Sequence, residues 1–293
     1  MNGNSAAAHQ NRQLRGEASL PQLVSLMQRA YDRDLAGYEE TFLARSLERR
    51  LAATSLDAAA YLARLEQDGV EAETLVRSLN VGYSEFFRNP LTFALLEQVV
   101  LPGFADQQAA SVRAAIRVWS AGCAAGQEPY SIAILLADLA ASRVEPLPFR
   151  IIATDVCEAE LASARRGMYN QRSVQNVRLR HLNEYFSRHG EHYAIVPRLR
   201  EWVDFSIYDL RDERSNGPPT GIYGDFDLVI CCNLLLYYRP QTRRIILSKL
   251  RRCLSPRGLL VTGESERAII ENEGGFRALF SPAAIFRLAS RGR

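Results

Sequence analysis

The chain of 293 residues is 47% hydrophobic and 24% charged, and its formal net charge is +3 at pH 7. These proportions are typical of globular proteins and exclude a chain that is disordered or membrane-embedded throughout. No unbroken apolar run approaches the ~20 residues that a membrane span needs, so no membrane insertion is expected. The small basic excess is weak evidence for nucleic-acid binding; we expect no nucleic-acid partner, and a monomer is the default expectation.

The cysteines and histidines form neither a disulfide framework nor a metal-binding pattern. Five cysteines include no CxxC pair, and the four histidines are scattered along the chain. We therefore expect reduced thiols and no metal. The first residues lack the apolar segment of a secretory signal, which predicts a cytoplasmic protein.

The N-terminal part is expected to be a small helical domain over residues 17–82, after a disordered tail over residues 1–16 that lacks apolar periodicity. Apolar residues then recur at intervals of three and four, which is the helical period. Ser19 and Ser55 are the expected N-cap residues. The four predicted helices cover residues 19–35, 38–53, 56–67 and 71–82.

From residue 83 to residue 293, strand-like and helical segments alternate. The predicted strands cover residues 114–123, 149–155, 226–232, 259–265 and 283–290. The predicted helices between them cover residues 129–141, 158–169 and 240–254. Such alternation predicts an α/β fold with a mostly parallel sheet covered on both faces. The last strand is expected to pair antiparallel at the edge of the sheet.

A glycine turn between the first strand and helix predicts a nucleoside site. The stretch VWSAGCAAGQEPYS places Gly122 and Gly126 where the backbone can approach a ligand closely. Asp155 ends the next strand about 30 residues later, where a carboxylate suits ribose hydroxyls. No GxxxxGK[ST] motif is present, so the ligand is expected to lack a triphosphate. Glu128 could balance a cationic ligand or simply stabilise the helix N-terminus; both interpretations are open.

Five stretches together resemble the chemotaxis receptor methyltransferases, the CheR family. They are SEFFRNPLTF, VWSAGCAAGQEPYSIAILLAD, IIATDVCEAELASARRGMY, FDLVICCNLLLYY and GLLVTGESE, in family order, and the resemblance runs from about Gln22 to Leu288. It implies an all-α N-terminal domain followed by a class I, Rossmann-like methyltransferase domain that binds S-adenosylmethionine. The implied reaction transfers a methyl group to glutamate side chains on the cytoplasmic helices of chemoreceptors, giving glutamyl methyl esters and S-adenosylhomocysteine.

The resemblance also implies the site residues. The cofactor residues carried over are Ser84, Arg88, Glu128, Asp155, Asp209, Leu210, Cys232 and Asn233. In this assignment Asp155 binds the ribose and Glu128 binds the amino acid part of the cofactor. Arg88 and Tyr237 are the catalytic candidates, because Arg88 could hold a carboxylate and the Tyr237 hydroxyl could orient the acceptor.

Simpler interpretations of these side chains stay open. A glutamate acceptor is already ionised at neutral pH, so no general base is expected. Tyr237 and its neighbour Tyr238 could instead be aromatic packing residues. Arg88 could instead cap a preceding helix.

The sequence departs from the family pattern at several positions. Cys232 stands where the family usually has arginine, which removes a charge-assisted bond of about 1.5–3 kcal/mol. Ser84 replaces a threonine, and Gly82 and Asp209 replace asparagines. Because side chains alternate along a strand, Cys231 and Cys232 should face opposite ways, so at most one of them meets the site.

The resemblance predicts how the protein meets its partner. A small inserted β-hairpin is expected over about residues 186–206, and its shortness predicts that no receptor tether is used. Arg45, Arg49 and Arg50 are the expected docking residues for acidic receptor helices. Two alternatives remain: a methyltransferase of the same fold with another acceptor, and a noncatalytic module that binds S-adenosylmethionine or S-adenosylhomocysteine.

Overall fold

The computed structural model describes residues 19–80, 82, 84–109, 115–219 and 224–289, so the expected tail over residues 1–16 lies outside the described residues. These residues form two units. The first unit comprises the chain up to residue 80 together with Tyr237–Arg243, and the second comprises the remainder. Across the described ranges, no helix is both long and apolar enough to cross a membrane.

The first unit contains the four predicted helices, which are confirmed. They are a helix over 19–31, α2 (Glu40–Thr54), α3 (Ala58–Leu65) and α4 (Gly69–Leu79). The expected cap at Ser55 is wrong, since Ser55 ends α2 in the left-handed region with φ 56°. Asp57, directly before α3, caps that helix instead by accepting a hydrogen bond from the Ala60 N–H.

A buried ion pair ties three helices of the first unit together. Arg50 on α2 donates from Nε and Nη2 to the two carboxylate oxygens of Glu71 on α4, at 2.9 and 2.8 Å. The Tyr61 hydroxyl on α3 donates to the same carboxylate at 2.7 Å. The Glu71 side chain is 5% exposed and that of Arg50 is 19% exposed. Arg50 is therefore a structural residue of this unit.

The segment Tyr237–Arg243 is part of the first unit through backbone and ring contacts. Tyr238 forms an isolated antiparallel bridge with Tyr38, and the two rings stack with centroids 5.0 Å apart. The Arg239 N–H donates to the Gly37 carbonyl at 2.9 Å. This arrangement supports the interpretation of Tyr238 as a packing residue.

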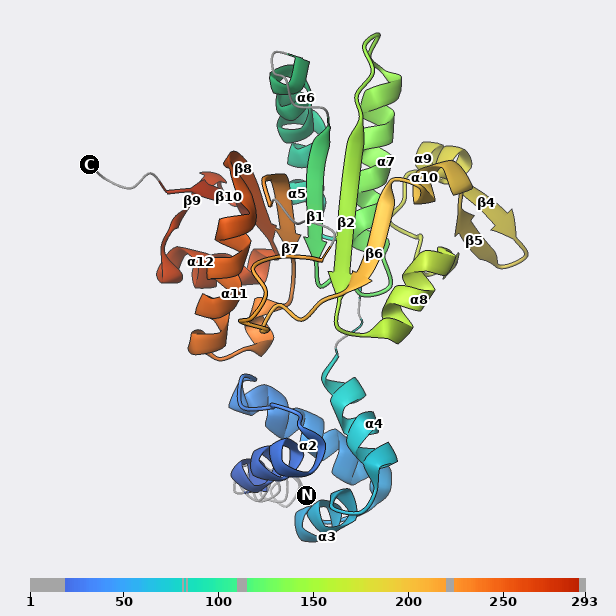
Figure 1. The fold of residues 1–293 in the computed structure, drawn as a ribbon. Helices are drawn as coiled ribbons and strands as arrows, with labels where there is room; N and C mark the ends of the chain where they lie inside the picture. Colours follow the sequence, from blue (N-terminus) through green and yellow to red (C-terminus); the bar gives the residue numbers. More distant parts are fainter. Residues whose placement is uncertain (1–18, 81, 83, 110–114, 220–223, 290–293) are drawn as a thin grey trace, which may run out of the picture. The chain divides into compact units, whose positions relative to one another are not determined.

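The second unit is built on a seven-stranded sheet with the order β6-β2-β1-β7-β8-β10-β9 (Figure 1). Its strands are β1 (Ile116–Ala121), β2 (Phe149–Asp155), β6 (Val203–Ile207), β7 (Phe226–Cys231), β8 (Leu254–Thr262), β9 (Phe276–Phe280) and β10 (Ile285–Leu288). The first five in spatial order are parallel, and β10 is antiparallel to both β8 and β9. The predicted parallel sheet with an antiparallel last strand is confirmed. The expected place of that strand at the edge of the sheet is wrong, because β9, which was not predicted, pairs with β10 and forms the edge.

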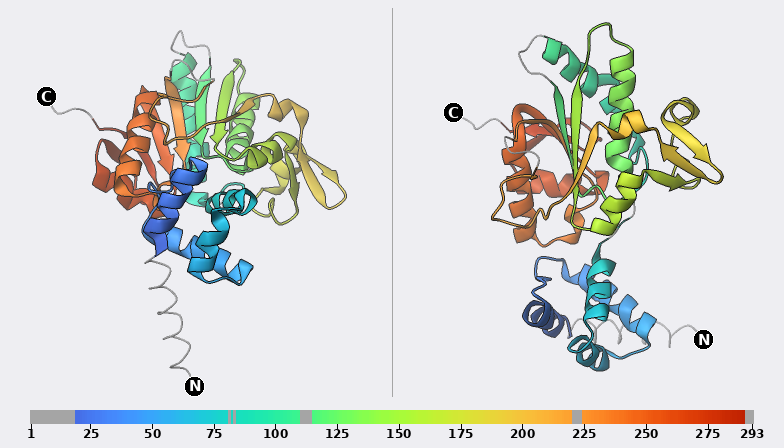
Figure 2. Two further views of the ribbon diagram at one scale, coloured as in Figure 1. Left: turned by 60° about the horizontal axis from the view of Figure 1, so that its bottom comes forward. Right: turned by 45° about the vertical axis from the view of Figure 1, so that its right-hand side comes forward.

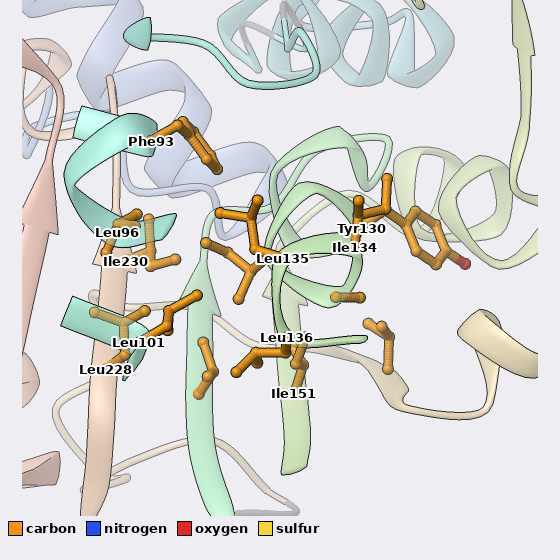
Figure 3. Close-up of a cluster of buried hydrophobic side chains, with 14 of the residues drawn as sticks. Phe93, Leu96, Leu101, Tyr130, Ile134, Leu135, Leu136, Ile151, Leu228 and Ile230 are labelled. Atoms are coloured by element: carbon orange, nitrogen blue, oxygen red, sulfur yellow. The ribbon is translucent and has the colours of Figure 1, made fainter. Parts of the chain in front are cut away.

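Helices cover both faces of this sheet, with α7 on one face and α11 on the other (Figure 2). The helices are α5 (Pro90–Leu95), α6 (Leu101–Ala109), α7 (Gln127–Ala141), α8 (Glu158–Arg166), α9 (Leu179–Tyr185), α10 (Pro197–Arg200), α11 (Pro240–Cys253) and α12 (Arg267–Glu273). A π-helical turn, Leu96–Val100, joins α5 to α6. Apolar side chains from α5, α6 and α7 pack against β2 and β7 to form the main core (Figure 3).

A second, three-stranded antiparallel sheet has the order β3-β5-β4 and consists of β3 (Met168–Asn170), β4 (Phe186–His189) and β5 (His192–Ile195). The hairpin expected over about residues 186–206 is thus shorter, because Val203–Ile207 pairs parallel with β2 in the large sheet. The helix expected over 158–169 ends at Arg166, since Gly167 takes a left-handed φ of 61°. Alternation alone does not tell which sheet a strand joins.

We expect Arg50→Met to lower the free energy of unfolding by about 3 kcal/mol, because it leaves a buried carboxylate without its bidentate cation. Arg49→Met is the matched control: Arg49 is exposed on the same helix, and its loss should cost about 0.5 kcal/mol or less. Urea unfolding followed by circular dichroism measures both. Equal losses for the two variants would contradict a structural role for the ion pair.

Candidate cofactor site at the carboxyl edge of the sheet

The parallel strands end at one edge of the sheet, and the strand order reverses between β1 and β7. In open α/β sheets ligands bind outside the carboxyl ends of the strands at such a reversal. The polar stretches that follow β1, β2, β6, β7 and β8 therefore belong to one candidate site.

The turn after β1 has two positions that only glycine can occupy, and these two glycines form the glycine cradle of the site. Gly122 has φ 81° and Gly126 has φ 90°, both in the left-handed region. A Cβ atom at Gly122 would lie 2.6 Å from Leu234 Cδ1, and one at Gly126 would lie 2.8 Å from the Ala164 Cβ. The backbone of this turn is therefore held close to its neighbours, as a nucleoside-binding turn requires.

Asp155 lies at the end of β2 and braces this turn. Its Oδ2 accepts from the Ala124 N–H and its Oδ1 from the Cys157 N–H, both at 2.9 Å. Burial raises the pKa of the Asp155 carboxyl, and these two N–H groups oppose the shift. Each oxygen keeps a lone pair that can accept from a ribose hydroxyl. The Tyr208 N–H, at the end of β6, donates to the Asp155 carbonyl at 3.0 Å.

Glu128 lies in the first turn of α7, and the partners of its carboxylate among the described residues are side chains. The Ser120 hydroxyl donates to its Oε1 at 2.7 Å, and the Cys232 thiol is a second hydrogen-bond partner. Removal from solvent raises the pKa of Glu128 to about 7; the negative charge of Glu266 adds to the shift and the positive charge of Arg88 opposes it. The structure thus brings Glu128, Cys232 and Arg88 together.

The two neighbouring cysteines face opposite ways, as predicted. Cys231 is fully buried, whereas Cys232 is partly exposed and meets Glu128. Burial raises the pKa of both thiols well above the ordinary value, so Cys232 stays protonated. It supplies a neutral hydrogen-bond donor at the position where an arginine would supply a charge.

The loop after β6 neutralises the extra charge of Asp209. Its Oδ1 accepts from the Arg211 N–H at 2.8 Å and its Oδ2 from Arg211 Nη2 at 2.9 Å. Leu210 is buried at 5% exposure. The negative charge that distinguishes Asp209 from an asparagine is therefore paired locally, a compensation that sequence reasoning missed.

Lys249 on α11 supports the same loop. It is 3% exposed, and its Nζ donates to the Asp212 carbonyl at 2.7 Å. The ammonium also lies 5.0 Å from the centroid of the Tyr208 ring, within cation–π range. Lys249 is the only lysine of the chain, which is the one feature of the sequence that sets it apart. Its contacts with Asp212 and Tyr208, which are far away in sequence, could not be predicted.

The turn after β7 carries Asn233, whose φ of 58° is left-handed. Its side-chain Oδ1 is buried and has no hydrogen-bond partner among the residues that the structure describes. Such an unpaired buried acceptor is costly and suits a ligand donor. Glu266, which holds this turn, lies within the GLLVTGESE stretch, yet sequence reasoning gave it no role.

For three of the predicted site residues, Ser84, Arg88 and Tyr237, the structure gives fewer contacts that bear on the cofactor. Ser84 is half-buried. Arg88 does not cap a preceding helix, because residues 84–89 are not helical. Tyr237 belongs to the first unit, where its ring centroid lies 4.7 Å from that of Phe42.

The donor set fits S-adenosylmethionine. Gly122 and Gly126 admit a nucleoside, Asp155 suits its ribose, Glu128 suits the cationic amino acid end, and Asn233 offers a buried acceptor without a partner. Together with the strand order, this edge defines a nucleoside-binding α/β protein of the class that includes the S-adenosylmethionine-dependent methyltransferases.

Comparison with known proteins identifies the family. The profile described as "CheR methyltransferase, all-alpha domain" matches residues 18–79, and "CheR methyltransferase, SAM binding domain" matches residues 83–285. The chain therefore belongs to the CheR methyltransferase family. It is an S-adenosylmethionine-dependent methyltransferase, and the predicted fold class, a helical domain followed by a class I methyltransferase domain, is confirmed.

Several relatives match over most of the chain. The "Chemotaxis protein methyltransferase" of Salmonella typhimurium is 33% identical over 239 residues, covering 79% of this chain and 77% of the relative. That of Escherichia coli is also 33% identical over 239 residues, covering 79% and 78%. An "Uncharacterized 104.1 kDa protein" of Rhodobacter capsulatus is 30% identical over 263 residues, which are 89% of this chain but only 26% of that protein.

We expect the affinity for S-adenosylhomocysteine to fall as pH falls through the Glu128 pKa of about 7. The carboxylate attracts the ligand's ammonium only when ionised, so Kd should rise roughly eightfold from about pH 7.5 to about pH 6. Isothermal titration calorimetry measures this. Glu128→Gln should bind more weakly and with a flat pH profile. A wild-type Kd that does not vary over this range would contradict the pairing.

Proposed function

We propose that this methyltransferase acts on glutamate side chains of chemoreceptors or of a related signalling protein, forming glutamyl methyl esters. The observation that carries the proposal is the match of both the helical domain and the S-adenosylmethionine-binding domain to one family. Relatives with 77% and 78% of their length covered bear the name chemotaxis protein methyltransferase. The partners would be the cytoplasmic helices of chemoreceptors.

The chemistry requires positioning more than proton transfer. S-adenosylmethionine supplies a methyl group activated by a sulfonium. A glutamate acceptor has a pKa of ~4.3 and is ionised at neutral pH, so the chain need not provide a base. Arg88 would hold the acceptor carboxylate, and the Tyr237 hydroxyl would orient it. The Arg88 charge acts on Glu128, which supports a place for Arg88 beside the cofactor.

Docking would use the exposed arginines of α2. Arg45 and Arg49 are exposed and lie four residues apart, so they share one face of the helix. We leave Arg50 out of this docking face, because its guanidinium already pairs bidentately with Glu71. A pair of exposed positive charges would attract an acidic receptor helix.

The acceptor can be tested directly with methyl-labelled S-adenosylmethionine and membranes from the host of this protein. We expect label in protein that mild alkali releases as methanol, because glutamyl esters hydrolyse there and N-methyl or ether products do not. Arg88→Ala should abolish the label, and Tyr237→Phe should lower kcat with S-adenosylhomocysteine affinity unchanged. Alkali-stable label would reject the glutamate acceptor and favour another nucleophile.

We expect Arg45→Glu with Arg49→Glu to lower kcat/KM for the receptor roughly tenfold, because the reversed charges repel an acidic helix. Affinity for S-adenosylhomocysteine should not change. The matched control is Arg29→Glu with Arg77→Glu, two exposed arginines on other helices of the same unit. Equal effects of the two double variants would mean that net charge, not the α2 face, governs docking.

A further inference from the structure

Glu266 is a fully buried carboxylate at 0% exposure, in the turn that follows β8. Its oxygens accept four backbone hydrogen bonds, and no cation pairs with it among the residues that the structure describes. The bonds come to Oε1 from the N–H groups of Leu234 at 2.7 Å and Leu235 at 2.6 Å, and to Oε2 from those of Asn233 at 2.7 Å and Gly263 at 2.8 Å. The carboxylate thus joins the ends of β7 and β8.

The turn Asn233–Leu235 depends on this carboxylate for its shape. Three consecutive N–H groups point at one side chain, and Asn233 takes a left-handed φ of 58°. In a regular strand or helix, consecutive N–H groups find backbone carbonyls instead. Without Glu266 the buried Leu235 N–H would lose its acceptor, and the turn would have to rearrange to find others.

The same turn is wedged between two glycines of the cofactor edge. A Cβ at Gly263 would lie 2.7 Å from Asn233 Nδ2 and 2.9 Å from Glu266 Oε2. A Cβ at Gly122 would lie 2.6 Å from Leu234 Cδ1. A small displacement of the turn would therefore move the cofactor candidate Asn233. It would also move the Leu234 side chain, which packs against Gly122.

We propose that Glu266 is a positioning residue that holds the Asn233–Leu235 turn in its cofactor-binding shape before the cofactor arrives. The proposal rests on the assignment of this edge as the S-adenosylmethionine site. Glu266 does not itself need to touch the cofactor, since all four of its contacts are backbone N–H groups of the protein. Its effect is preorganisation, which lowers the cost of ordering the turn on binding.

The test is Glu266→Gln, which keeps the shape of the side chain but turns an NH2 group toward backbone donors. We expect Kd for S-adenosylhomocysteine, measured by calorimetry well below the unfolding temperature, to rise at least tenfold. KM for S-adenosylmethionine should rise by a larger factor than kcat falls. A Kd within twofold of wild type would overturn the proposal.

Glu71→Gln is the matched control, because it makes the same change at a buried carboxylate of the first unit. It should lower Tm while leaving Kd for S-adenosylhomocysteine within twofold of wild type. A tenfold rise in this control would assign the effect to lost stability and overturn a specific role for Glu266.

Two measurements keep the proposal testable if Glu266→Gln does not fold. Gly263→Ala removes no charge, and Gly263 has an ordinary φ of −67°, so its added methyl group should act only by pushing on Asn233 and the carboxylate. It should also raise Kd at least tenfold. In the wild type without cofactor, hydrogen exchange of the amides of residues 233–235 should be slow; fast exchange would show that the turn is not preorganised and would overturn the proposal.

The outcomes separate this inference from the proposed function. If wild-type protein binds S-adenosylhomocysteine and Glu266→Gln binds it equally, only the role of Glu266 fails. If wild-type protein binds no S-adenosylhomocysteine, the cofactor site itself fails, and with it both proposals. The nature of the methyl acceptor has no influence on the measurements of Kd for S-adenosylhomocysteine or on the hydrogen exchange of the turn.

Discussion

Three carboxylates lie buried or half-buried at the carboxyl edge of the large sheet, where the cofactor site is proposed. The hydrogen-bond donors that stabilise each carboxylate determine the role it can have. Burial raises the pKa of Asp155, Glu128 and Glu266 alike. Glu266 is satisfied by four backbone N–H groups and Asp155 by two. Glu128 accepts from a hydroxyl and a thiol, and no backbone N–H of the described residues donates to it. Glu128 is consequently the carboxylate that gains most from a cationic ligand.

This difference gives physical meaning to the cysteine at position 232. A thiol that stays protonated donates a weak, neutral hydrogen bond, whereas a guanidinium in its place would favour the charged form of Glu128. The positive charge that acts on Glu128 therefore comes from Arg88 and, in the proposed site, from the ligand. At two of the other positions where the sequence departs from the family pattern, neighbouring residues compensate for the change. The charge of Asp209 is paired with Arg211. At Gly82, a Cβ would lie 2.5 Å from the Glu160 carboxylate, so that side chain fills the space.

Sequence patterns predicted the four helices of the first unit, and in the second unit α7, α8, α11 and the parallel strands β1, β2, β7 and β8. Apolar residues recur at the helical period in these helices and form short apolar runs in these strands. These patterns did not distinguish which sheet Val203–Ile207 joins, since an edge strand and a hairpin strand have the same alternation. The glycine turn and Asp155 were proposed from a strand end and glycine spacing, which are local signals, whereas the other candidate cofactor residues came from the family resemblance. Glu266 and Lys249 were missed because their importance lies in contacts with residues 31 to 37 positions away. The pairing of Arg50 with Glu71 was missed for the same reason.

The stretch from Asn233 to Arg243 is held at its two ends by different units. Residues 233–235 are fixed by Glu266 in the second unit, whereas Tyr237–Arg243 is fixed in the first unit by contacts such as that of Arg239 with Gly37. Leu236 is the residue at which the chain passes from one unit to the other. The cofactor candidate Asn233 therefore takes its position from the second unit, while Tyr237 takes its position from the first unit. In this chain the unit that contains the proposed docking arginines also contains the tyrosine that is proposed to orient the receptor's glutamate.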